Sequence, residues 1–97
     1  MLEAADQLEE LVGRGRDVYE GDVALRLAIE RLLAIIGEAA NAMSDDGRGR
    51  FPTVEWRDIT RLRIVLAHHY HRVDPDQVWT IASEDVPRLA RRLQPPA

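Results

Sequence analysis

The chain has no cysteine and no lysine, and only 5% of its 97 residues are aromatic. Without cysteine, disulfide bridges, cysteine–zinc sites and thiol nucleophiles are excluded. No apolar run approaches the roughly 20 residues that a bilayer-spanning helix needs. The N-terminus carries acids where a signal peptide would carry positive charge. We therefore expect a soluble, cytoplasmic protein without contact to a membrane.

The length of the chain limits it to one small domain, which we expect to span residues 1–97 with a frayed tail over 94–97. A domain of this size buries only about 60–65% of its unfolded surface. Since oligomerisation is a common remedy, we expect a homodimer. The 17 acids and 13 bases give a net charge of −4. This balance argues against a wholly nucleic-acid-coating surface, although it leaves room for a local basic cleft.

Apolar residues recur at spacings of three and four along the whole chain, and no segment alternates with period two. The sequence therefore predicts an all-α domain. The four expected helices span residues 2–12, 23–43, 54–66 and 75–93, the third being opened by Pro52 and Thr53. Glycine-rich polar segments at 13–21 and 44–50 are predicted to be connectors without helix.

Helix ends carry recognisable signals. Asp22 is a candidate N-cap for the second helix, which is apolar over most of its circumference and is therefore expected at the centre. Asp74 is a candidate N-cap for the fourth helix, with Pro75 at the first helical position and Gln77 completing a capping-box pattern. Pro87 is expected to kink or interrupt this last helix.

Titratable side chains are concentrated between Arg61 and Arg72, a stretch that holds all three histidines, one of two tyrosines and three arginines. Histidine moves protons near neutral pH, and arginine clamps phosphate groups. An Arg–His pair without acid partners or cysteine favours phosphodiester chemistry on RNA. There the 2′-hydroxyl of the substrate is the nucleophile, and no metal is required.

Two other readings of the histidines remain open on the residues alone. His68 and His71 lie one helical turn apart, with Asp74 beyond them, which suggests a metal site. This set matches no established zinc spacing and contains no HExxH arrangement. Alternatively, the histidines are solvated residues at a helix end, where cations interact favourably with the helix dipole.

Several segments resemble one protein family in their order along the chain. They are Ile35–Ala40, Trp56–Ile59, Arg63 through His68 to Tyr70, Val78–Ile81 and Asp85–Leu89. Over residues 22–93 the sequence resembles the HepT branch of the HEPN superfamily (higher eukaryotes and prokaryotes nucleotide-binding). Members of this branch are toxins paired with the antitoxin MntA, a minimal nucleotidyltransferase.

The resemblance implies a HEPN-like four-helix up-and-down bundle that forms a homodimer and acts as a metal-independent RNase toxin, with tRNA among its candidate substrates. The superfamily motif is an Arg, four to six residues, and a His. Arg63 with His68, Arg63 with His69 and Arg61 with His68 all satisfy it. The pattern of the branch selects Arg63, His68 and Tyr70. Arg63 and His68 differ by about 140° around a helix, which a composite site shared by two protomers accommodates.

The resemblance also assigns roles around this pair. Arg63 holds the scissile phosphate, His68 handles protons, and Arg61, His69 and His71 assist RNA binding. Tyr70 is the residue to which the antitoxin transfers AMP, so ATP and Mg²⁺ are expected only on the antitoxin. For this chain we expect no metal and no cofactor. Glu38 pairs with an arginine of the cleft such as Arg63, or forms an ordinary salt bridge on the helix surface.

This sequence departs from the family pattern in two places. The Asn that follows the motif Arg in the family is Ile64 here. This change supports an alternative function, a catalytically weak or inactive HEPN module that binds a nucleotidyltransferase. The first helix is also abbreviated relative to the family.

Four further residues receive structural interpretations. Trp56 and Trp79 fall on apolar faces and are predicted as core or dimer contacts. Arg48 and Arg50 are predicted to lie in a solvated loop, with phosphate contacts as the alternative.

Overall fold

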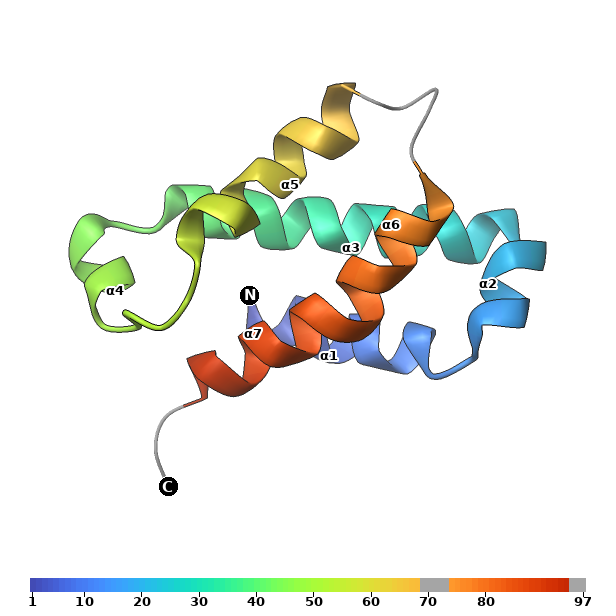
Figure 1. Cartoon of the computed structure of the whole chain (residues 1–97), viewed down its shortest axis with the longest axis horizontal. Coiled ribbons are helices and arrows are strands. Elements are labelled where there is room, and N and C mark those ends of the chain that lie inside the picture. Colours follow the sequence, from blue (N-terminus) through green and yellow to red (C-terminus); the bar gives the residue numbers. More distant parts are fainter. Residues whose placement is uncertain (69–73, 95–97) are drawn as a thin grey trace.

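The computed structural model describes residues 1–68 and 74–94, and every regular element within these ranges is a helix. The all-α prediction is therefore confirmed. Three principal helices are α1 (Leu2–Val12), α3 (Val23–Ala42) and α5 (Trp56–His68). The fourth, which we call the C-terminal helix, consists of α6 (Pro75–Thr80), η1 (Ile81–Asp85) and α7 (Val86–Leu93). The four alternate in direction along the chain, as the predicted up-and-down bundle requires (Figure 1).

Helix α3 is the centre of the domain, as its wide apolar arc predicts. It packs against α5 on one side and against α1 on the other (Figure 1). The predicted cap is present, because the Asp22 carboxylate accepts a hydrogen bond from the Leu25 backbone N–H at 3.2 Å. The first two turns differ from the prediction, since Val23 and Leu27 are 58% and 60% exposed.

The C-terminal helix packs against α1 through η1 and α7. One continuous core joins these helices to α3. Its members include Leu8, Tyr19, Leu25, Ile29, Leu33, Ile36, Val78, Ala82, Val86 and Leu89. Aliphatic residues and alanine supply most of this core, which agrees with the low aromatic content of the sequence.

The predicted interruption at Pro87 takes the form of one π turn. The backbone N–H of Val86 donates to the carbonyl of Ile81, five residues earlier. Pro87 has no N–H to donate to the preceding turn, so a regular α-helical ladder is broken there in any case. The wider turn also aligns the buried residues Val78, Ala82 and Val86. In a regular α-helix, a spacing of four would rotate each by about 40° from the one before.

At the start of the C-terminal helix, one of the two hydrogen bonds of the predicted capping box has a counterpart. The Asp74 carboxylate accepts a hydrogen bond from the Asp76 backbone N–H at 2.9 Å, and Pro75 occupies the first turn. Within the described residues, Gln77 makes no hydrogen bond back to Asp74, so the predicted capping box is half formed.

The prediction of a plain connector over 13–21 is wrong, because Arg16–Gly21 form the short helix α2. Gly15 permits the entry to this helix with φ of 99°, a conformation that other residues rarely adopt. Tyr19 of α2 is buried in the core of the domain, with only 1% of its surface exposed. This packing against other helices stabilises α2.

The prediction of a solvated loop over 44–50 is also wrong, because Asp45–Gly49 form the short helix α4. The Ser44 hydroxyl caps it by accepting from the Gly47 N–H at 3.0 Å. The Arg48 guanidinium donates to the carbonyls of Ala40 and Asn41 at 2.9 and 3.3 Å. Arg48 thus satisfies the last carbonyls of α3, whereas Arg50 is exposed as predicted.

The third predicted helix begins later than expected, at Trp56. Residues before it form turns, in which the Val54 N–H donates to Phe51 and the Trp56 N–H donates to Val54. The indole of Trp56 donates to the carbonyls of Arg48 and Phe51 at 3.1 and 3.2 Å. Trp56 is therefore a structural contact that joins α4 to α5.

In the described part of the chain, no helix is both long and apolar enough to cross a membrane.

Candidate functional site

Helix α5 carries the predicted catalytic residues. It continues as an α-helix through Arg61 and Arg63 to His68. Positions 61 and 68 are seven residues apart and lie within about 20° of each other around the axis, whereas positions 63 and 68 differ by about 140°. The backbone therefore places Arg61 and His68 on one stripe of the helix and does not align Arg63 with them.

Part of the predicted site lies outside the described residues. The side chains of Arg63 and His68 lie outside the described part of the structure, as do the residues His69, Tyr70 and His71 entirely. The roles assigned to these five residues stay predictions. Glu38 is exposed on α3, and no ion pair involves it among the described residues. Because the side chain of Arg63 is not described, the pairing of Glu38 with Arg63 also stays a prediction.

The metal alternative also involves residues outside the described ranges. No three His, Asp or Glu side chains among the described residues lie close enough together to hold a metal ion. His68 and His71 fall outside that search, so the set of His68, His71 and Asp74 is not decided by it.

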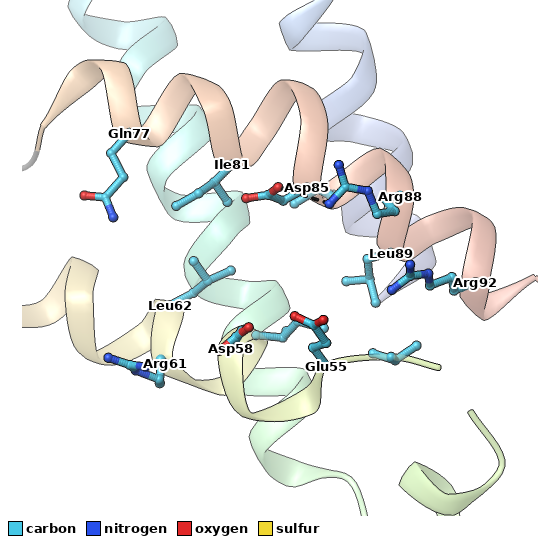
Figure 2. A pocket seen from close by; sticks show the side chains of 13 residues that line it. Glu55, Asp58, Arg61, Leu62, Gln77, Ile81, Asp85, Arg88, Leu89 and Arg92 are labelled. Atoms are coloured by element: carbon cyan, nitrogen blue, oxygen red, sulfur yellow. Dashed lines mark ion pairs between the residues drawn. The ribbon is translucent and has the colours of Figure 1, made fainter. Parts of the chain in front are cut away.

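Arg61 lines a cavity between α5 and the C-terminal helix. The cavity has a volume of about 500 Å³. Aliphatic side chains line its middle, with Leu62 contributed by α5 and Ile81 and Leu89 by the C-terminal helix (Figure 2). Ile59 of α5 also lines the cavity. Although α5 packs closely on α3, the cavity separates it from the C-terminal helix.

Charged side chains surround the aliphatic surface. Those from the α5 side are Glu55, Asp58 and Arg61, and those from the C-terminal helix are Asp85, Arg88 and Arg92. Figure 2 shows the Glu55 carboxylate and the Arg92 guanidinium pointing into the same space from opposite walls. Arg88 lies 3.7 Å from Asp85, an exposed ion pair. The lining therefore contains three acids and three arginines and carries no net charge.

Arg92 joins the two walls at one end of the cavity. Its guanidinium donates to the backbone carbonyl of Thr53 at 2.9 Å. Thr53 belongs to the turns that lead into α5. The hydrogen bond therefore ties the end of the C-terminal helix to the beginning of α5 across the cavity.

A different cluster fixes the first turn of the C-terminal helix. The Tyr19 hydroxyl donates to the carbonyl of Pro75 at 3.1 Å, and its ring packs on Trp79 with centroids 5.1 Å apart. Arg16, which also contacts Glu20 at 2.9 Å, forms an ion pair with Asp76. These contacts anchor the chain immediately after residues 69–73, the segment that contains Tyr70. Trp79 is thereby confirmed as a core contact.

Burial raises the pKa of the Tyr19 hydroxyl above its ordinary value, and the nearby charge of Glu30 adds to this shift. Because the neutral form is favoured, Tyr19 remains a hydrogen-bond donor at neutral pH. Burial likewise raises the pKa of Glu30, while the neighbouring Arg26 lowers it by a smaller amount.

Comparison with known families decides what kind of protein this is. The model of the family described as HepT-like, "Ribonuclease HepT-like", matches residues 1–95. The chain belongs to the HepT-like ribonuclease family. This agrees with the resemblance read from the segments between Ile35 and Leu89, and extends it over the first helix.

Two named relatives are similar to this HepT-like protein over about three quarters of its length. "Putative RNase MJ1380" of Methanocaldococcus jannaschii is 39% identical over 70 residues, 72% of this chain and 64% of the relative. "Probable ribonuclease HepT" of Thermococcus cleftensis is 34% identical over 73 residues, 75% of this chain and 66% of the relative. The matches thus span just under two thirds of these relatives. No solved structure matches the chain.

Of the charged residues that line the cavity in this HepT-like chain, Arg61 was predicted from the sequence as a site residue and the others were not. Asp85 and Arg88 lie in the segment Asp85–Leu89, which was noted only for its family resemblance. Charged residues alternating with buried Val86 and Leu89 were the available signal, since they indicate a helix with one packed and one polar face.

Proposed function

We propose that this chain is an RNase toxin that cleaves RNA without a metal ion. The observation that carries the proposal is the family match over residues 1–95. It is supported by α5, which holds Arg63 and His68 on one continuous helix. RNA is the proposed substrate class, and tRNA is a candidate within it.

In the proposed reaction, the 2′-oxygen of the substrate attacks the adjacent phosphorus, and the bond from phosphorus to the 5′-oxygen breaks. His68 accepts the proton of the 2′-hydroxyl and returns one to the leaving 5′-oxygen. Arg63 stabilises the negative charge that gathers on the phosphate oxygens. Neither step requires a cofactor from this chain.

The active site is proposed to be shared between two protomers. The separation of about 140° between positions 63 and 68 argues against one RNA phosphate contacting both residues of a single chain. In a homodimer, Arg63 of one copy and His68 of its partner face the same cleft. Confining the arginines and histidines to this cleft also explains how a chain with a net charge of −4 binds RNA.

Regulation is proposed to act through Tyr70. A MntA-like nucleotidyltransferase, which supplies the ATP and Mg²⁺ sites, transfers AMP to the tyrosine hydroxyl. The added phosphate and bulk next to His68 repel and block RNA. Intact-mass analysis after co-expression tests this step. AMP addition to the wild type, lost in Tyr70→Phe, supports it, and AMP addition to Tyr70→Phe contradicts the assignment.

The central experiment compares purified wild type with His68→Ala and His69→Ala on RNA in the presence of EDTA. Because His68 is the proposed proton-transfer group, its removal is expected to lower the cleavage rate about 100- to 10,000-fold. His69→Ala is the matched control, since both histidines satisfy the general motif. Equal rates for wild type and His68→Ala would refute the role of His68, and loss only in His69→Ala would transfer it.

The shared site has its own test by complementation. His68→Ala and Arg63→Ala chains are co-expressed with different tags, and the mixed dimer is purified. A composite dimer retains one intact pair, formed by Arg63 of one chain and His68 of the other, so it regains cleavage that neither homodimer has. A mixed dimer that stays inactive would show that each chain uses its own pair.

A second candidate function is a binding module that engages the nucleotidyltransferase without cutting RNA. Ile64 supports it, because an apolar side chain replaces the family's Asn beside the motif Arg and offers no hydrogen bond to Arg or phosphate. Inactivity of the wild type, with intact binding of the nucleotidyltransferase, supports this function. Gain of cleavage in Ile64→Asn would identify the missing amide as the cause.

A further inference from the structure

The proposed cleavage chemistry does not use the cavity between α5 and the C-terminal helix. We propose that this cavity receives one unpaired base of the RNA, next to the scissile phosphate, and that it favours bases with an exocyclic amino group over uracil. The inference rests on the proposed ribonuclease function, which it extends from RNA in general to a base-selective subsite.

The position of the cavity connects it to the cleavage residues. Arg61 lines the cavity and lies on the same stripe of α5 as position 68. Seven residues correspond to about 10 Å along the helix axis. A single strand that passes His68 along this stripe therefore brings a neighbouring nucleotide to the mouth of the cavity.

The volume and the aliphatic lining of the cavity suit a planar base. Its volume of about 500 Å³ lies within the usual range for small-ligand sites. Leu62 faces Ile81 and Leu89 from the opposite wall (Figure 2), and Ile59 also lines the cavity. Enzymes that extrude a base hold it between apolar or aromatic side chains in this manner.

Two carboxylates set the preference among the bases. Glu55, immediately before α5, and Asp58, in the first turn of α5, line the cavity. Neither side chain has a hydrogen-bond or ion-pair partner among the described residues. Ionised carboxylates only accept hydrogen bonds. Cytosine, adenine and guanine present amino donors, whereas uracil presents mainly carbonyl acceptors. Uracil would therefore leave these carboxylates without good partners.

The arginines suit the phosphates that flank this base. Arg61 and Arg88 are exposed at the cavity. The Arg88–Asp85 pair is 3.7 Å long and exposed, so little energy holds Arg88 in place. The exposed carboxylates of Glu55 and Asp58 beside the aliphatic surface repel a phosphate there, which leaves the base in the cavity and the phosphates outside it.

A basic protein segment is the competing occupant, and the charge balance argues against it. Three arginines offset the three acids of the lining, so the cavity has no net negative charge to attract such a segment. The shared stripe with His68 favours RNA. The experiment below includes the protein partner as one of its outcomes.

The test measures binding and cleavage separately. Fluorescent single-stranded oligoribonucleotides that differ at one position (A, C, G or U) are titrated with His68→Ala protein, and the same set is cleaved by chains with intact His68. Asp58→Asn and Glu55→Gln are compared with Glu84→Gln in both measurements. Glu84 is exposed in η1 and does not line the cavity, so its variant controls for the loss of one negative charge.

We expect uracil to be disfavoured about 5- to 100-fold at one position, the range that a good base contact supplies. Asp58→Asn or Glu55→Gln should reduce this preference to within about threefold, while Glu84→Gln keeps it. Thermal unfolding of each variant verifies that the fold is retained.

The remaining outcomes separate this inference from the proposed function. Cleavage without base preference, or a preference that both cavity variants leave unchanged, overturns the base subsite while the ribonuclease stands. Base-selective binding without any cleavage by the wild type refutes the ribonuclease and supports the subsite. Loss of nucleotidyltransferase binding in the cavity variants, with RNA binding unchanged, identifies a protein surface and overturns the subsite.

Discussion

The two sides of the C-terminal helix are built in opposite ways. Toward α1 and α2 it is closely packed, with Leu8 at 0%, Tyr19 at 1% and Ala82 at 1% exposure. Toward α5 it borders a cavity of about 500 Å³ whose walls carry charges. The difference shows how a small domain keeps an open site. A helix that is fixed along one side does not need close contacts along the other.

The packed side also carries the polar contacts that fix the helix in position. Tyr19 hydrogen-bonds to the carbonyl of Pro75 and packs on Trp79. On the open side, a single hydrogen bond from Arg92 to Thr53 spans the two walls among the described residues. Substitutions on the packed side should therefore affect the free energy of unfolding, whereas those on the open side should mainly affect ligand binding.

The largest expected difference comes from two leucine truncations. Leu8→Ala removes a fully buried side chain between α1 and its neighbours and should lower the free energy of unfolding by about 2–5 kcal/mol. Leu62→Ala removes a half-buried wall of the cavity and should cost about 1 kcal/mol or less. Urea denaturation measures both. Equal losses would show that the cavity wall is packed as tightly as the core.

A smaller effect is expected from Tyr19→Phe. The ring contact with Trp79 remains, but the Pro75 carbonyl loses its donor, so the variant should be about 1 kcal/mol less stable at neutral pH. In the folded protein the pKa of Tyr19 lies above its ordinary value of 10.0. The stabilisation is therefore complete below pH 10 and is lost as the pH rises through the folded pKa.

Thermal unfolding of wild type and Tyr19→Phe between about pH 7 and 11.5 checks this prediction. The difference in Tm should shrink at the alkaline end, because ionisation of Tyr19 favours the unfolded state in the wild type only. A difference that stays constant over this range would show that the hydroxyl is exposed to solvent in the folded state.

The smallest effect concerns Glu30, also on the packed side. Burial raises its pKa in the folded protein, so its contribution to stability is present when the carboxyl is protonated and is lost as the pH rises through the folded pKa. Glu30→Gln should therefore raise Tm at neutral pH by about a degree or two and have no benefit at acidic pH. Glu10→Gln, an exposed site on α1, serves as the control. A lower Tm for Glu30→Gln would mean that attraction to Arg26 outweighs burial.

Much of the fold follows from local signals in the sequence. Asp22 and Asp74 were identified as N-caps because a short acid precedes an apolar helical pattern, and both accept the expected type of bond. The short helices α2 and α4 were missed for a physical reason. Neither is stable through its own residues, and each depends on a distant contact made by Tyr19 or Arg48.

The site was less predictable than the fold. Arg61, Arg63 and His68 lie within eight residues of each other, so a sequence motif is enough to predict them as site residues. The cavity combines Asp58 with Asp85 and Arg88, which lie on separate helices and meet only after α5 and the C-terminal helix have both packed. No local pattern encodes such an arrangement, because it depends on the space that two packed helices leave between them.

The π turn at Ile81–Asp85 has a consequence for comparing related chains. A π turn holds one residue more than an α turn, so the helix on either side would remain intact if a single residue were lost from this turn. Relatives that differ in length by one residue should therefore show that difference between Ile81 and Val86, whereas a one-residue deletion elsewhere in the helix would rotate its buried face away from α1. The turn thus marks the point where evolution can lengthen or shorten this helix by one residue at low cost.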